Sequence, residues 1–99
     1  MKKTYVVFVE RTEKWDRSKE AHEQESFSEH VAYMSELEQS GFIAMAGLLA
    51  ESELILFVIL ADNADEVRNA FANDPMQQAG LARVTRLEEA HFRIGAPHQ

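Results

Sequence analysis

Two strand-like segments of this 99-residue chain, both without a charged residue, constrain its fold more than any other feature. Thr4 to Val9 is β-branched and aromatic, and Leu54 to Leu60 is the most apolar stretch of the chain. Both patterns predict strands. Because successive side chains of a strand point to opposite faces, we expect both strands to be covered on both sides.

Two helices and two further strands complete the predicted elements. In chain order, the elements are a strand at 4–9, a helix at 26–40, strands at 42–48 and 54–60, a helix at 63–73 and a strand at 82–92. Gly41 supplies the stop signal of the first helix. Asn63, followed by Glu66, predicts the start of the second helix, and Asp74-Pro75 predicts its end. The segment at 10–24 is polar and charge-dense.

The order β-α-β-β-α-β is the split pattern of a ferredoxin-like domain, an α+β fold with a four-stranded antiparallel sheet and two helices on one face. In that topology the first and third strands lie in the middle of the sheet and the fourth lies at an edge. The two apolar strands are the first and third, whereas the fourth carries four charged residues: Arg83, Arg86, Glu88 and Glu89. The distribution of polarity therefore supports this topology.

The two helices cover only one face of the sheet, although the central strands are apolar on both. The first strand presents apolar side chains to each face: Tyr5, Val7 and Val9 to one, Val6 and Phe8 to the other. A second copy of the chain is the simplest cover for the remaining face. We therefore expect a homodimer with two sheets packed face to face, or a higher oligomer.

Composition bounds the class of protein. The length fits one domain at 1–99, and 45% hydrophobic with 27% charged residues is ordinary for a globular protein. The absence of cysteine excludes disulfides, zinc fingers and thiol nucleophiles. A formal charge of −7 argues against a nucleic-acid partner. No signal-peptide pattern is present, and the longest apolar run is too short to span a bilayer, so we expect a cytoplasmic protein without a membrane partner.

His30 and Asp74 are polar residues on two otherwise apolar helical stripes. The stripe of the first helix comprises Phe27, Val31, Met34 and Leu37, and His30 falls within it. Asp74 extends the stripe of the second helix just before Pro75. Because an unpaired buried polar group costs about 1–3 kcal/mol, we expect both side chains to have partners, and each could be the partner of the other.

The segment from His30 to Phe92 resembles the YciI-like (YCII-related) family of the dimeric α/β-barrel superfamily. The matching features, in order, are His30 with Leu37 and Gly41, then Ala46-Gly47, then Asp74-Pro75 with Gly80 beyond. Leu48 stands where a proline commonly follows the glycine, and Met76 replaces a usual aromatic residue. The segment before His30 is also longer than in short members.

The resemblance implies a ferredoxin-like dimer with an active site centred on His30 and Asp74. One characterised branch of the family eliminates chloride from a chlorinated hydroxyhydroquinone. A histidine beside a carboxylate is a standard general base, because imidazole titrates near neutral pH. The corresponding hypothesis is a cofactor-free lyase or isomerase. The structural alternative is a core histidine bonded to backbone, with Asp74 merely capping the turn before Pro75.

Several other residues are secondary candidates for substrate contact, each with a simpler structural interpretation: Tyr33, Glu10, Arg11, Gly47 and Met76. Trp15 is either a lid anchor over the pocket or a dimer contact. The spacing of eight between His22 and His30 does not place them on one helical face, and no carboxylate completes a ligand set, so we expect no metal site. His91 and His98 are expected on the edge strand and in the tail, without a role.

Two functional hypotheses from different classes remain at this point. One is the small enzyme with a His30/Asp74 pair, and the other is a non-catalytic module that binds a small ligand or serves assembly on the same scaffold. Haem-degrading or quinol-type monooxygenases of the same fold group share the architecture but not this pair. Fold alone does not choose among them.

Overall fold

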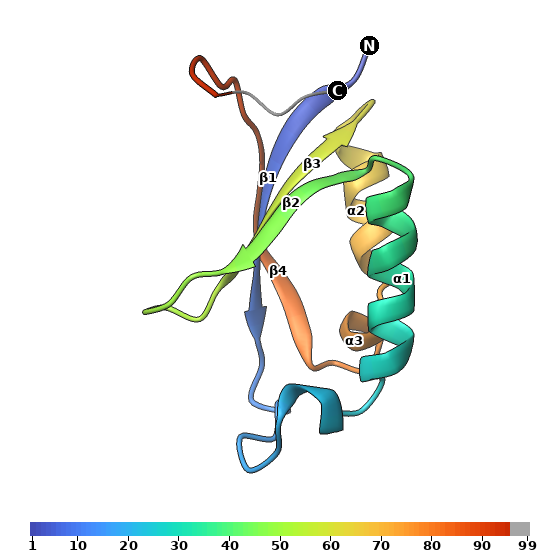
Figure 1. Cartoon of the computed structure of the whole chain (residues 1–99), viewed down its shortest axis with the longest axis vertical. Coiled ribbons are helices and arrows are strands. Elements are labelled where there is room, and N and C mark those ends of the chain that lie inside the picture. Colours follow the sequence, from blue (N-terminus) through green and yellow to red (C-terminus); the bar gives the residue numbers. More distant parts are fainter. Residues whose placement is uncertain (96–99) are drawn as a thin grey trace.

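The computed structural model describes residues 1–95 and is an α+β structure built on one antiparallel sheet. Its elements are β1 (Lys3–Arg11), the short 3-10 helix η1 (Ala21–Glu23), α1 (Phe27–Gln39), β2 (Ile43–Leu48), β3 (Ile55–Ala61), α2 (Ala64–Ala72), α3 (Pro75–Gln78) and β4 (Ala82–Glu89). The strand order is β2-β3-β1-β4, and α1, α2 and α3 lie on the same side of the sheet (Figure 1). The predicted class is confirmed, and the order is compatible with a ferredoxin-like fold.

The two uninterrupted apolar strands lie in the middle of the sheet, as predicted. β1 pairs with β3 on one side and with β4 on the other, with a bulge between Phe8 and Val9 on the β4 side. Alternate residues of β1 join the core beneath the helices, and this core also includes Phe57, Val67 and Phe71. Phe57 and Phe71 meet edge to face with ring centroids 4.9 Å apart, a favourable arrangement for aromatic rings.

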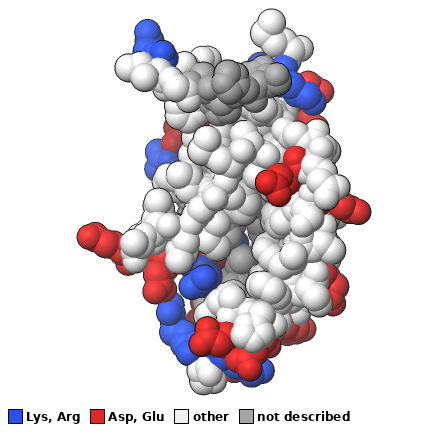
Figure 2. Space-filling model, in the orientation of Figure 1, with Lys and Arg blue, Asp and Glu red and all other residues white. Residues whose placement is uncertain are grey.

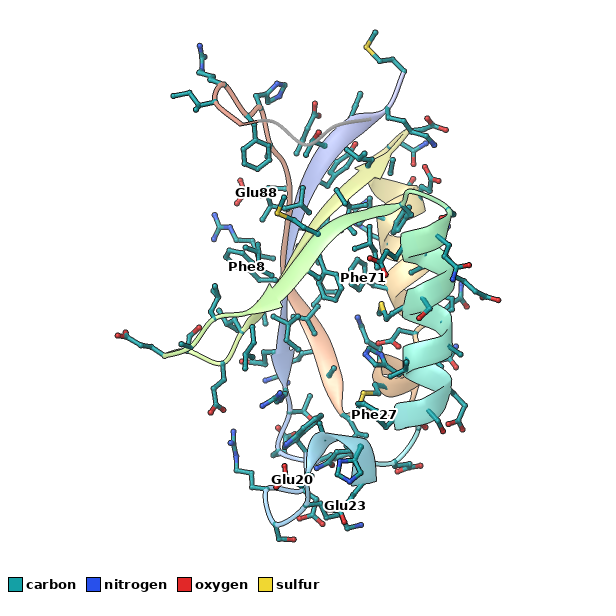
Figure 3. The ribbon with its side chains drawn as sticks, in the orientation of Figure 1. Phe8, Glu20, Glu23, Phe27, Phe71 and Glu88 are labelled. Carbon is teal, nitrogen blue, oxygen red and sulfur yellow. The ribbon has the colours of Figure 1, made fainter. Side chains whose placement is uncertain are left out.

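The other face of the sheet has no element of residues 1–95 packed over its centre. Figure 3 shows Phe8 and Glu88 on the side away from the helices. The β1 residues between the core positions, Val6 and Phe8, are only half-buried, as is Leu56 on β3. This apolar surface, which we call the open face, is the one for which the sequence predicts a partner.

The end of α1 follows the prediction, whereas one member of its apolar stripe does not. Gly41 has a φ of 86°, and Phe42 donates its backbone N–H to the Leu37 carbonyl at 3.0 Å, which closes the helix. Met34 and Leu37 pack against the core. The expectation that Val31 is buried is wrong, because Val31 is 44% exposed and faces an open hollow between α1 and β2.

The region after α2 contains a third helix that the sequence analysis did not predict. Asn63 caps α2 by accepting the Glu66 N–H at 2.9 Å, as expected. Helix α2 ends at Ala72 with Asn73 as its C-cap, one residue before the predicted Asp74-Pro75 end. Asp74 is the N-cap of α3, where it accepts the Met76 N–H, and Pro75 occupies the first helical position. Proline is favoured there because that position needs no N–H donor.

Strand β4 ends earlier than the prediction of 82–92. Its last residue, Glu89, pairs with Tyr5, and β1 begins only two residues before Tyr5, so little partner strand remains beyond that point. His91 therefore lies outside the strand on which it was expected. The expectation for His98 lies outside the described residues.

The segment between β1 and α1 is ordered by its own polar contacts. Gln24 is buried and joins two parts of the segment, accepting the Asp16 N–H at 3.1 Å and donating to the Asp16 carbonyl at 2.7 Å. Glu20 and Glu23, labelled in Figure 3, form a capping box around η1. Within residues 1–95, no helix combines the length and apolar character needed to cross a membrane.

Candidate active site

His30 and Asp74 meet where the start of α1 passes α3. His30 is in the first turn of α1, where its N–H binds the Ser26 carbonyl at 2.9 Å. Asp74 has an extended backbone between α2 and α3, which turns its side chain back across the start of α3. Contacts between α1 and α3 bring these two positions together although they are 44 residues apart in sequence.

The two side chains form a direct hydrogen bond. His30 Nδ1 lies 2.6 Å from Asp74 Oδ1, and the side chains are 25% and 3% exposed. Because a carboxylate only accepts hydrogen bonds, Nδ1 is the protonated nitrogen of the ring and Nε2 is left to accept a proton. The pair therefore has the arrangement expected of a histidine general base whose tautomer is fixed by a carboxylate.

Of the two contacts that the structural alternative predicted, the structure contains one. Asp74 does cap the turn at Pro75, because Oδ1 also accepts the Met76 N–H at 3.4 Å. The partner of His30, however, is the Asp74 side chain and not a backbone group. One carboxylate thus both starts α3 and orients the imidazole.

A small cavity borders the pair. It has a volume of about 150 Å³ and is lined by His30, Asp74 and Arg11 together with apolar and aromatic side chains, among them Trp15, Phe27, Phe57, Phe71 and Met76. We call it the aromatic cavity. In Figure 3, Phe71 lies between the sheet and α1, and Phe27 lies at the start of α1 close to η1. A dry apolar cavity of about this volume is large enough for a single benzene ring.

A second, wider hollow adjoins the aromatic cavity. It has a volume of about 470 Å³ and runs along β2 and α1, with Met45, Gly47 and Leu48 in its wall. We call it the β2 cleft. Arg11, His30, Ile55 and Phe57 line both spaces. Figure 2 shows the surface hollowed between the sheet and α1, with mainly uncharged surroundings and a basic group at its edge.

A separate hollow near the helices lacks comparable chemistry. It has a volume of about 520 Å³ near the other end of α1, and its lining includes Lys2, Gly41 and Glu66 but no histidine. We therefore place the candidate site at His30.

The structure brings three of the secondary candidates to these spaces. Arg11 lines both, Met76 lines the aromatic cavity, and Gly47 lines the β2 cleft. Glu10 lies elsewhere and accepts a hydrogen bond from Arg83 Nε at 2.6 Å.

Tyr33 lines neither space, and its hydroxyl donates to the Ala70 carbonyl at 2.6 Å. Burial raises the pKa of Tyr33 above its ordinary value, and the negative charges of Asp74 and then Glu36 raise it further. Tyr33 therefore ties α1 to α2 instead of facing a ligand.

For Trp15 the sequence left two roles open, a lid anchor over the pocket or a dimer contact. It lines the aromatic cavity, and the Arg11 guanidinium carbon lies 4.3 Å from its ring centroid. The structure thus places Trp15 at the cavity. The sequence feature that pointed to Trp15 is that it is the only large apolar residue in the charged segment at 10–24. Within residues 1–95, no group of three or more His, Asp or Glu side chains is placed to hold a metal ion.

Comparison of the chain with protein-family models, with curated proteins and with solved structures found no match.

Proposed function

We propose that this chain is a small cofactor-independent enzyme of the YciI-like type, with His30 as general acid/base and Asp74 as its orienting partner. The observation that carries the proposal is the 2.6 Å contact between His30 Nδ1 and Asp74 Oδ1 in the wall of the aromatic cavity. A histidine hydrogen-bonded to a carboxylate beside a cavity is the geometry that general acid/base catalysis requires.

The chemistry that fits the pair is proton transfer. His30 Nε2 takes a proton from a carbon acid or from water, and Asp74 stabilises the imidazolium that forms. Returning the proton to another atom of the substrate completes an isomerisation. Expulsion of a leaving group with its electron pair completes an elimination, and attack by the deprotonated water leads to hydrolysis.

The cavity supports a small aromatic or enol-type substrate. Its volume of about 150 Å³ and its aromatic walls favour one planar ring, and the adjoining β2 cleft leaves room for substituents. The resemblance to a family with a dehalogenating branch supports the same class of substrate.

The proposed working form is a homodimer. The open face carries half-buried apolar side chains, Val6, Phe8 and Leu56, and the neighbouring Met45 is 55% exposed. A second copy of the same face would remove this surface from water.

The enzyme proposal is tested by assaying the wild type and variants against chlorinated and hydroxylated aromatics and lactones. For any compound turned over, His30→Ala is expected to lower kcat/KM by about 10²–10⁴-fold, the usual contribution of a general base. Asp74→Asn should lower it in the same direction, whereas His22→Ala, a change at an exposed histidine of η1, should not. Full activity of His30→Ala would exclude the proposed role.

A non-catalytic ligand-binding module on the same scaffold is the second candidate. The observation that favours it is the aromatic cavity itself, which can hold a ligand without any reaction. Saturable binding of a panel compound that the wild type never turns over would support this candidate over the enzyme.

A further inference from the structure

Arg11 is a cation in the wall of the candidate site, and residues 1–95 offer it no hydrogen-bonded acceptor. Its side chain lines both the aromatic cavity and the β2 cleft. The Nε atom is buried and has no hydrogen-bond partner in the described part of the chain. A buried donor left in this state costs free energy, so the position calls for an acceptor.

Three of the carboxylates around Arg11 already have another side-chain partner in the described structure. Glu10, the preceding residue, binds Arg83, and Glu53 forms an ion pair with Arg17. Asp74 is hydrogen-bonded to His30, and no ion pair within residues 1–95 includes Arg11. The Arg11 guanidinium is therefore available to a ligand.

Trp15 holds Arg11 in place without neutralising it. The guanidinium carbon lies 4.3 Å from the centroid of the Trp15 ring, which is a cation–π contact. Stacking fixes the plane of the guanidinium, and a fixed plane favours two parallel hydrogen bonds to a carboxylate.

We infer that the site takes a small organic monoanion, with its carboxylate or enolate oxygens on Arg11 and its unsaturated or aromatic body in the aromatic cavity. The inference names the class of substrate for the proposed function, and it rests on that function only because both place the ligand in the aromatic cavity. His30, which lines the same two spaces, would then act on a carbon close to the anionic group.

The charges of the site favour one negative charge over two. Among residues 1–95, the cavity wall holds one cation without an ion-pair partner, Arg11, and one carboxylate, Asp74, so a dianion such as a phosphate monoester would meet repulsion from Asp74. The mainly apolar walls also favour a ligand whose charge is confined to one end.

The same cation has a chemical use during proton abstraction. Removing a proton next to a carboxylate or carbonyl moves an electron pair onto oxygen, and a fixed guanidinium stabilises that developing charge. Arg11 would thus bind the ground state and stabilise the intermediate, while the proton passes to His30.

The experiment compares benzoate with benzyl alcohol, two ligands with the same ring that differ in charge, by calorimetric titration of the full chain. Quenching of Trp15, the only tryptophan, provides a second readout for the wild type. We expect saturable benzoate binding at least about tenfold tighter than that of benzyl alcohol, because charge-assisted hydrogen bonds are the stronger ones. Absence of saturable benzoate binding, or equal affinities, would overturn the inference.

Variants separate the role of Arg11 from that of the catalytic pair. Arg11→Met should remove the preference for benzoate, and Arg11→Lys should keep part of it because the charge remains. Arg17→Met, a change of the exposed arginine paired with Glu53, is the matched control and should leave the preference unchanged. Retained preference in Arg11→Met, in a variant that unfolds like the wild type, would overturn the inference.

His30→Ala should still prefer benzoate, which distinguishes the two proposals. Benzoate preference without turnover of any panel compound would exclude the enzyme but support the anion site. Turnover of neutral compounds by a fully active Arg11→Met would exclude the anion site but support the enzyme.

Discussion

The Oδ1 atom of Asp74 is the residue-scale feature on which the candidate site depends. It accepts hydrogen bonds from His30 Nδ1 and from the Met76 N–H, so it joins the imidazole to the start of α3. The side chain is almost fully buried, and a buried carboxylate is tolerated only when such donors surround it. The geometry of His30 is therefore inseparable from the cap of α3.

Tyr33 gives a residue-scale prediction about pH. Its pKa is raised above 10.0 by burial, so the folded state holds the phenolic proton to higher pH than the unfolded state does. The contribution of Tyr33 to the free energy of unfolding is thus complete below about pH 10 and is lost as the pH rises through the folded pKa. An ultraviolet titration of phenolate formation, taken as the difference between wild type and Tyr33→Phe, should show this group ionising above pH 10. Ionisation at or below the ordinary value would contradict the prediction.

At the scale of elements, short segments fix the positions of the site residues Trp15 and Asp74. The helix η1 and its capping box hold the segment that carries Trp15, and Gln24 locks that segment from within. The Thr12 hydroxyl donates to the Gly80 carbonyl at 2.6 Å, which ties the same segment to the end of α3. Trp15 and Asp74 are therefore fixed by connected parts of the backbone.

Gly41 provides a prediction at this scale. Its φ of 86° is a left-handed conformation that other residues adopt only with strain, so Gly41→Ala should lower the free energy of unfolding by about 1 kcal/mol. Gly47→Ala is the matched control, because Gly47 has no positive φ and no heavy atom of residues 1–95 lies within 4 Å of an added Cβ. Denaturant unfolding measures both changes, and equal effects would show that the helix end is not strained.

At the scale of the whole molecule, the sheet divides the chain into a covered and an uncovered side. The helices pack over one side, where Val7 and Ile59 of the sheet and Val67 of α2 are fully buried between the two layers. On the open face, the apolar Val6 and Phe8 of β1 lie beside charged residues of β4, and Val6 pairs with Glu88. A monomer would leave this surface in water.

The dimer is the prediction at this scale. In sedimentation or light-scattering measurements, the wild type should have twice the mass of one chain, because pairing of open faces buries apolar area. Phe8→Asp should reduce the mass to that of a monomer, whereas Val31→Asp, at an exposed apolar site on α1, should not. A monomeric wild type would refute the proposed assembly.

Much of this arrangement could be predicted from the sequence, because patterns of apolar residues are local. The uninterrupted strands, the stop at Gly41 and the cap at Asn63 all follow from neighbouring residues. The meeting of His30 with Asp74 could be suspected from two polar residues on apolar stripes, but it depends on how α1 packs against α3. Helix α3 itself escaped prediction because it has only four residues, and the role of Trp15 depends on a contact with Arg11 that no periodicity encodes.

The central position of β1 has a consequence for the order of folding. During synthesis β1 is the first of the four strands to leave the ribosome, and the strands that flank it, β3 and β4, are made later. Tyr5, for example, pairs with Glu89, which is synthesised near the end of the described chain. Pairings between such remote segments form slowly. Until they form, an apolar strand with two unpaired edges can pair with strands of other chains and aggregate. The same residues that make β1 the centre of the finished sheet therefore make it the segment most exposed to misassembly before the sheet is complete.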